Sequence, residues 1–198
     1  MGGIGAISSF SFYPGKNLGA WGEGGAVTTN DDDLADFVGM FRNQGQVEKY
    51  HHKVYGHNYR LEALQGAVLG VKMKYIAGWT ENRRKVAAYY DAHLAGIEEL
   101  KLPVHMDYGK HVYHLYVLQA PDREALGAFL GERGVATGLH YPLPNHLQEC
   151  FAHLGGRKGQ FPVTEQLADR CLSLPMFPEM TEEQMAHVVE SVKAYFGA

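Results

Sequence analysis

One lysine follows a short apolar run, and its setting is the part of this sequence that could do chemistry. The run from Ala6 to Phe12 predicts a buried strand, which ends at Pro14-Gly15, and Lys16 comes next. A free lysine amine is protonated at neutral pH and is a poor nucleophile unless its surroundings change that. Two interpretations stay open on pattern alone. Lys16 is either a solvated lysine in a surface loop or an amine that holds a carbonyl compound as a Schiff base.

Glycines are dense around this lysine. Five of the eleven residues from 15 to 25 are glycine. This density predicts a backbone that passes close to something, or one that adopts positive φ several times. Two phosphate-binding templates do not fit. A Walker A motif would need glycine where Phe10 stands, and the dinucleotide fingerprint would need its third glycine where Val27 stands.

The segment SFSFYPGKNLGAWGEGGAVTTND resembles a known family. It is similar to the Schiff-base segment of the DegT/DnrJ/EryC1/StrS family of pyridoxal-phosphate-dependent sugar aminotransferases. The resemblance implies that Lys16 carries the cofactor and that Ser11, five residues earlier, contacts the cofactor phosphate. A dehydratase branch of the family has histidine in place of this lysine, and Lys16 argues against that branch.

A second match lies in GHNYRL, which begins at Gly56. By resemblance, the long loop before it reaches across a dimer, and Asn58 contacts the cofactor phosphate of the partner subunit. From pattern alone, Asn58 could instead cap a helix that begins near Leu61. The preceding histidines are His51, His52 and His57. No cysteine or acidic residue stands at ligand spacing from them, so no zinc site is expected.

A third match is the segment GLHYPLPNHL, which begins at Gly138. The simple interpretation is a turn built on prolines. The resemblance instead places the motif near the cofactor and sugar-nucleotide pocket, so that His140, Tyr141 and His146 would face the substrate. Asn145 departs from the leucine expected before that histidine.

The resemblance implies a fold and a function. The fold would be α/β, the C-terminal part of the type I pyridoxal-phosphate transferase fold: the end of the large domain, then a small α/β domain. The reaction would be transamination of a nucleotide-linked keto-sugar, possibly at C3, with an amino acid such as glutamate as donor and pyridoxal 5'-phosphate as cofactor. The active unit would be a homodimer with shared sites.

The resemblance covers only the C-terminal half of the family's proteins. The acidic residue that pairs with the pyridine nitrogen and the aromatic residue that stacks on the ring belong to the other half. We therefore expect a fragment, or the product of a truncated gene. The alternative to an enzyme is a catalytically incomplete module that keeps a dimerising or regulatory role.

Bulk properties narrow the class of protein. The 198 residues carry a net charge of −4 and no basic stripe, which argues against a nucleic-acid partner. The two cysteines, Cys150 and Cys171, have no metal or disulfide spacing, which suits a reducing compartment. No leader and no membrane-spanning apolar run is recognised. The expected location is the cytoplasm.

Hydrophobic periodicity predicts the elements that position these motifs. Asp31 and its neighbours cap a helix through Phe41, and residues 44–57 form an irregular loop. The apolar stripe of the next helix is Leu61, Leu64, Val68, Val71 and Tyr75. A further helix is expected after Gly78, which separates domains at 1–78 and 79–198.

The second domain is expected to alternate strands and helices. Strands are predicted at 111–118, 135–140 and 172–174. Asp122 caps a helix that ends near Gly134, and Thr181 and Gln184 form a capping box before the last helix.

Overall fold

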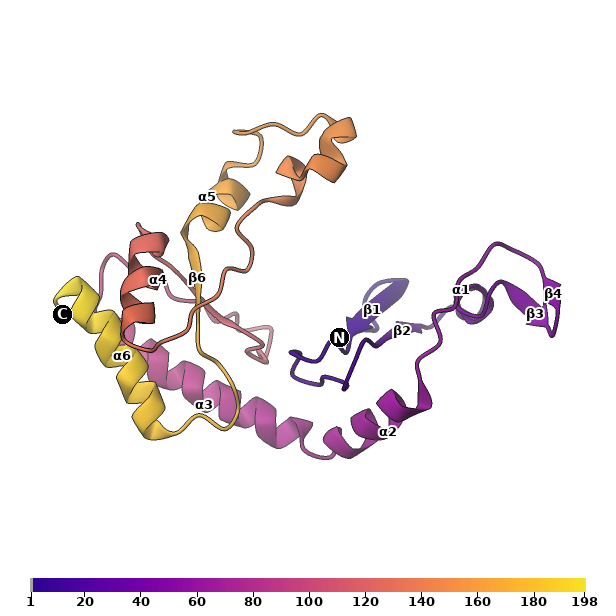
Figure 1. The fold of residues 1–198 in the computed structure, drawn as a ribbon, viewed down its shortest axis with the longest axis horizontal. Coiled ribbons are helices and arrows are strands. Elements are labelled where there is room, and N and C mark those ends of the chain that lie inside the picture. The colour runs from indigo at the N-terminus through magenta and orange to yellow at the C-terminus, as the bar shows by residue number, and fades with distance from the viewer. Residues whose placement is uncertain (1) are drawn as a thin grey trace. The chain divides into compact units, whose positions relative to one another are not determined.

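The computed structural model describes residues 2–198 (Figure 1). The chain divides into two compact units, one up to Ala77 and one from Gly78 to Ala198.

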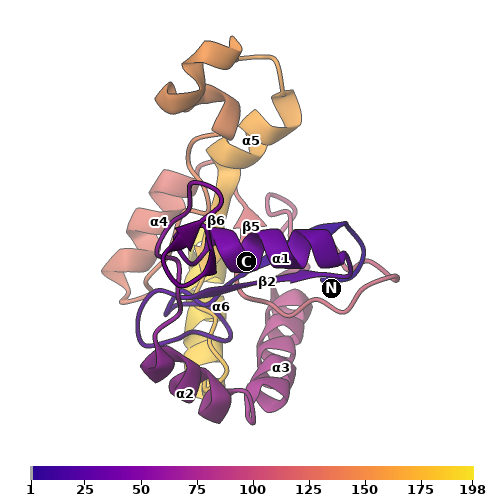
Figure 2. The ribbon, with the colours of Figure 1, turned by 90° about the vertical axis from the view of Figure 1, so that its right-hand side faces the viewer.

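The first unit begins with an antiparallel pair of strands. β1 (Ile7–Ser11) pairs with β2 (Gly25–Thr29), with Ser9 opposite Val27. Helix α1 (Asp32–Phe41) follows, and it runs alongside the strand pair (Figure 2). The carboxylate of Asp31 accepts the backbone N–H of Leu34 at 3.0 Å, which caps the helix as predicted.

The segment after α1 contains a small hairpin where an irregular loop was expected. β3 (Gln46–Glu48) pairs with β4 (His51–His52). Gly45 takes a φ of +75°, and a Cβ there would overlap the carbonyl of Val54. Tyr50 takes a φ of 70° in the turn. Because polar residues at positive φ do not show up as hydrophobic periodicity, the pattern missed this hairpin.

Helix α2 (Ala63–Lys72) turns a different face inward from the predicted one. Its buried residues are Gln65 and Leu69, whereas Leu64 is 62% exposed and Val71 is 58% exposed. The prediction assumed that apolar residues mark the buried face. In this unit the loop between β1 and β2 offers backbone polar groups to the helix, and the side chains of Gln65 and Lys72 bond to them.

Helix α3 (Ile76–Leu94) starts before Gly78, so that glycine lies within the helix and not between two helices. A helical glycine costs only about 1 kcal/mol relative to alanine, which the long helix tolerates. The other elements of the second unit are β5 (Tyr116–Gln119), α4 (Arg123–Glu132), two 3₁₀ turns (Asn145–Leu147 and Glu149–Leu154), α5 (Pro162–Arg170), β6 (Cys171–Leu174) and α6 (Glu182–Phe196).

The second unit has a continuous apolar core. Strands β5 and β6 pair antiparallel with Val117 opposite Ser173, and α3, α4 and α6 pack around them (Figure 1). The fully buried side chains include Tyr90, Leu118, Leu126 and Val192. Asp122 caps α4, and Thr181 with Gln184 forms the predicted capping box of α6.

One predicted strand is shorter in the structure, and another is absent. Residues 111–115 are irregular because Tyr113 takes a φ of 42° and the buried Arg83 guanidinium donates to the carbonyls of Tyr113 and His114. Those carbonyls are thus unavailable to a strand ladder. Residues 135–140 contribute one bridge, between Gly138 and Ser173, and no strand.

Within residues 2–198, no helix is long and apolar enough to cross a membrane. In the same residues, no group of three or more histidine, cysteine or acidic side chains is placed to hold a metal ion.

Candidate functional site

Lys16 lies on a loop that is closed at its base. The carbonyl of Phe12 accepts the N–H of Ala20 at 2.8 Å, and the N–H of Phe12 donates to the carbonyl of Gly24 at 2.8 Å. These two bonds continue the pairing of β1 and β2 and close off residues 13–19. Within the loop, the N–H of Lys16 donates to the carbonyl of Tyr13 at 2.8 Å. The half-buried Lys16 therefore follows a tight turn with a fixed base.

The glycines of this segment are needed for close packing within the chain itself. A Cβ on Gly19 would overlap the carbonyl of Pro14, one on Gly22 would lie 3.0 Å from Nε2 of Gln65, and one on Gly24 would lie 2.9 Å from Leu61. Gly25 is similarly close to the carbonyl of Phe10. None of these glycines has positive φ. Of the two predicted explanations, close approach is right and positive φ is wrong.

Ser11 is linked to Lys16 through Tyr13. Oγ of Ser11 accepts the N–H of Tyr13 at 3.2 Å, and the carbonyl of Tyr13 accepts the N–H of Lys16. Because its Oγ is used as an acceptor, the exposed Ser11 hydroxyl keeps its proton for an anionic group. A serine hydroxyl at the end of β1 and a lysine on the loop that follows are groups of the kinds that hold an aldehyde bearing a phosphate.

Asn58 belongs to a different segment of the first unit. It forms a bridge with Asn43, and its side chain is exposed. Its predicted alternative as a helix cap is wrong, since α2 begins after Glu62. The exposed position leaves the Asn58 amide accessible to a group outside its own segment.

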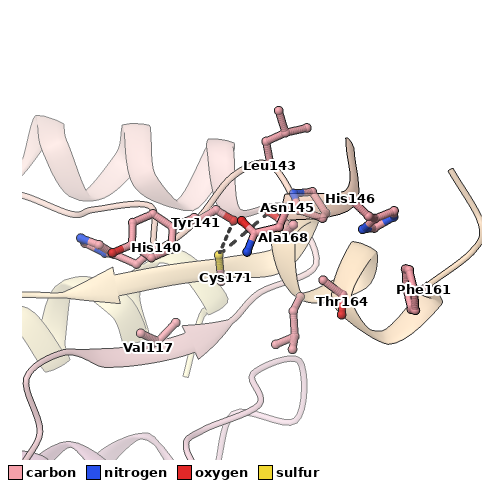
Figure 3. A pocket seen from close by; sticks show the side chains of 12 residues that line it. Val117, His140, Tyr141, Leu143, Asn145, His146, Phe161, Thr164, Ala168 and Cys171 are labelled. Atoms are coloured by element: carbon pink, nitrogen blue, oxygen red, sulfur yellow. Dashed lines mark hydrogen bonds between the residues drawn. The ribbon is translucent and has the colours of Figure 1, made fainter. Parts of the chain in front are cut away.

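His140, Tyr141 and His146 line one pocket in the second unit. The pocket has a volume of about 560 Å³ and also contacts Asn145, Phe161, Thr164 and Cys171. His140 and Tyr141 lie at one end, and His146 and Phe161 lie at the other (Figure 3). Nδ1 of His140 is hydrogen-bonded to Oγ of Ser173 at 2.8 Å, so β6 holds this ring in place.

A carboxylate that the sequence did not single out fixes His146. Oε1 of Glu165 lies 3.0 Å from Nε2 of His146, and both side chains are 12% exposed. The carboxylate also accepts the N–H groups of Gly159 and Phe161. These bonds, those from Gly159 foremost, lower the pKa of Glu165.

The candidate residues thus form two groups. In the first unit, Ser11 ends β1 and Lys16 lies on the closed loop that follows. In the second unit, His140, Tyr141 and His146 share the pocket. Sequence reasoning missed Gln65, Lys72 and Glu165. The sequence did contain a signal for Gln65 and Lys72, because positions 65, 69 and 72 share one face of a helix.

The fold and this site define a class of protein. The chain has the fold of the type I pyridoxal-phosphate transferases over the part that it spans, with an α/β architecture and a lysine loop after the first strand. DesV of S. venezuelae, solved in complex with a ketimine intermediate, superposes with a TM-score of 0.95 at 38% identity. The match covers 100% of this chain and 53% of DesV. An aminotransferase from Brucella abortus superposes with a TM-score of 0.92 at 31% identity, covering 100% of this chain and 52% of that one.

The chain belongs to the DegT/DnrJ/EryC1/StrS aminotransferase family, whose model matches residues 1–193. It is 46% identical to the pleiotropic regulatory protein of Geobacillus stearothermophilus over 99% of its own length and 53% of that protein. It is 40% identical to the UDP-N-acetyl-3-dehydro-alpha-D-glucosamine 3-aminotransferase of Acidithiobacillus ferrooxidans, over 98% of this chain and 52% of that protein. The chain therefore spans about half the length of the curated relatives it matches.

Proposed function

We propose that this chain takes part in the pyridoxal-phosphate-dependent transamination of a nucleotide-linked keto-sugar at C3, in amino-sugar biosynthesis, with an amino acid such as glutamate as donor. The observation that carries the proposal is the closed loop that bears Lys16 and follows directly on β1, the strand that ends at Ser11. C3 is favoured because several relatives are named for 3-amino sugars, among them the 3-aminotransferase of Acidithiobacillus ferrooxidans and a dTDP-3-amino-3,6-dideoxy-alpha-D-galactopyranose transaminase.

In this proposal each residue has a defined role. Lys16 would hold the cofactor through Nζ. Once the donor's amine has displaced it, the freed Lys16 amine would take a proton from the reacting carbon of the donor and, in the second half of the reaction, would deliver one to the reacting carbon of the keto-sugar. The Ser11 hydroxyl donates to the cofactor phosphate. His140, Tyr141 and His146 orient the sugar nucleotide. The cofactor, when bound, supplies the electron sink.

We further propose a homodimer in which Asn58 reaches the cofactor phosphate of the partner subunit. The first unit exposes many large apolar side chains, including those of Leu64, Val71 and Tyr75, and α1 has no buried residue. Apolar surface on this scale is typical of a face that another surface covers. Residues 1–78 would then be the cofactor-binding part and residues 79–198 the small α/β domain.

The test is chemical labelling of the purified chain. After incubation with pyridoxal phosphate and reduction with borohydride, we expect the cofactor's mass on the peptide that contains Lys16. Lys16→Ala should carry no adduct, and Lys74→Ala, which changes an exposed lysine, should label as the wild type does. Labelling of Lys16→Ala at the wild-type level would overturn the assignment.

The second candidate function is a dimerising or regulatory module without catalysis. It is favoured by the name of the Geobacillus relative, a pleiotropic regulatory protein. Specific labelling of Lys16 supports the enzyme. A folded, dimeric chain that leaves Lys16 unlabelled supports the module.

A further inference from the structure

Two side chains of α2 are bonded to the backbone of the lysine loop. The amide Oε1 of Gln65 accepts the N–H of Trp21 at 2.8 Å. The ammonium Nζ of Lys72 donates to the carbonyl of Gly19 at 2.5 Å. Both bonds join residues more than forty positions apart in the sequence, so they are tertiary contacts that the loop cannot make alone.

The spacing of Gln65 and Lys72 explains why one helix can make both hydrogen bonds. Gln65, Leu69 and Lys72 stand at i, i+4 and i+7, which places them on one face of α2. Gln65 and Leu69 are the buried residues of this helix, and Lys72 is half-buried. The inward face of α2 is therefore an amide, a leucine and an ammonium group, which is unusual for a face that packs against its own unit.

The backbone groups they meet need partners. Gly19 and Ala20 are buried, with Ala20 only 1% exposed. A buried carbonyl without a hydrogen bond costs free energy comparable to a lost bond, and a bond to a charged donor is among the stronger ones. Lys72 thus satisfies the carbonyl of Gly19, at the residue where the loop closes against Pro14.

We propose that Gln65 and Lys72 are positioning residues for Lys16. They fix Gly19 and Trp21 on either side of Ala20, whose N–H closes the base of the loop. Because the base of the loop at residues 13–19 is fixed, the amine of Lys16 is restricted to a narrow range of positions. This inference rests on the proposed function of Lys16 and adds a second layer of residues that act through it.

The test compares four variants of the whole chain. Lys72→Met keeps the stem and removes the donor, Lys72→Arg keeps a charged donor, and Gln65→Leu removes the acceptor. Lys74→Met is the matched control, since Lys74 is exposed and lies two residues further along. The first measurement is amide hydrogen exchange without cofactor. We expect Lys72→Met and Gln65→Leu to speed exchange at Ala20 and Trp21 at least about tenfold, with no change in the exchange of the second unit.

The second measurement is the rate at which saturating pyridoxal phosphate becomes fixed to Lys16 under borohydride. It should fall about tenfold or more in Lys72→Met, recover in Lys72→Arg, and stay at the wild-type level in Lys74→Met. A role confined to stability would instead lower the melting temperature without changing exchange at these two amides. Unchanged exchange and unchanged fixation in both Lys72→Met and Gln65→Leu would overturn the proposal.

Failure of the proposed function has a different signature. If Lys16 is never labelled even in the wild type, the exchange measurement still decides whether α2 holds the loop. If Lys72→Met fails to fold, Gln65→Leu can be compared with Lys72→Arg and the wild type in the same two measurements.

Discussion

The imidazole of His146 and the carboxylate of Glu165 are 3.0 Å apart at the end of the pocket that also holds His140 and Tyr141. Glu165 lies in the first turn of α5, and it accepts backbone N–H groups from the loop just before that helix. One carboxylate thus links the 3₁₀ turn that bears His146, the loop at 159–161 and α5. This link therefore helps to fix the orientation of the His146 ring in the pocket wall.

Glu165→Gln should weaken the contacts with His146 and with the N–H groups of Gly159 and Phe161. It should also remove the ionisable carboxyl group from these contacts. The pKa of Glu165 is lowered by its bonds, so the carboxylate's stabilising effect is complete above the ordinary glutamate value of about 4.3 and is lost as the pH falls through the lower folded value. We expect the melting temperature of the wild type to drop in this acidic window. The melting temperature of the glutamine variant should be lower than that of the wild type at pH 7, and it should fall less on acidification. Glu149→Gln, at an exposed glutamate in the second 3₁₀ turn, serves as control, and parallel acid profiles for wild type and Glu165→Gln would contradict the assignment.

The elements that the sequence predicted well are those with local signals. Asp31, Asp122 and Thr181 all cap helices, because a side-chain oxygen at the right offset is sufficient for that. The strand ahead of Lys16 and the turn that bears it were likewise predictable, since an apolar run that ends at Pro-Gly is a local pattern. The prediction that this strand is buried is wrong, because four of the five residues of β1 are exposed.

The contacts that periodicity could not predict are long-range and polar. Periodicity assigns the apolar face of a helix to the interior, and α2 reverses that rule because Gln65 and Lys72 meet backbone groups. The bonds of Arg83 to the carbonyls of Tyr113 and His114 likewise shorten a predicted strand. Glu165 has no local signal for its role, because its partner His146 lies nineteen positions away.

Gly19→Ala should disrupt the lysine loop. Its Cβ would overlap the backbone carbonyl of Pro14, and backbone atoms on both sides leave no side chain that could move aside. We expect a destabilisation of about 1–3 kcal/mol by urea unfolding, together with loss of cofactor fixation on Lys16. Gly66→Ala lies in α2 with open space around it and should be neutral or stabilising by up to about 1 kcal/mol. Wild-type fixation in Gly19→Ala would show that the loop's closure does not position Lys16.

Ser11→Ala should weaken the binding of the phosphate and leave the aldehyde chemistry intact. Removing a hydrogen bond to a charged group costs about 1.5–3 kcal/mol, which corresponds to a loss of affinity of about tenfold or more. We expect this loss for pyridoxal phosphate and none for pyridoxal, measured by half-saturation of borohydride labelling at Lys16. Ser9→Ala changes a serine two residues earlier on the same face of β1 and should affect neither compound. An equal loss for both compounds would mean that Ser11 supports the loop and does not contact the phosphate.

Mixing two inactive variants should test the shared site. Asn58→Ala keeps Lys16 and lacks the amide proposed to cross the dimer, whereas Lys16→Ala keeps the amide and lacks the amine. A mixed dimer contains one intact site, so the Asn58→Ala chain should regain wild-type affinity for pyridoxal phosphate when the Lys16→Ala chain is added. Mass spectrometry of the intact complex would confirm that mixed dimers form. If they form and affinity does not return, Asn58 acts within its own chain or not at all.

The second unit should lose stability in alkali because two buried tyrosines resist ionisation. Burial raises the pKa of Tyr90, and burial together with a hydrogen bond to Asp91 raises the pKa of Tyr116. A raised folded pKa means that both rings stay neutral in the folded chain while an unfolded tyrosine ionises near pH 10, so stability is complete below about pH 10 and falls as the pH rises further. Tyr90→Phe should flatten this alkaline decline. It should also cost about 1 kcal/mol at pH 7, since the Tyr90 hydroxyl donates to the carbonyl of Pro175 at 2.9 Å. Tyr108→Phe, at an exposed ring, should leave the whole profile unchanged, and an identical alkaline decline in wild type and Tyr90→Phe would refute the link between burial and pH.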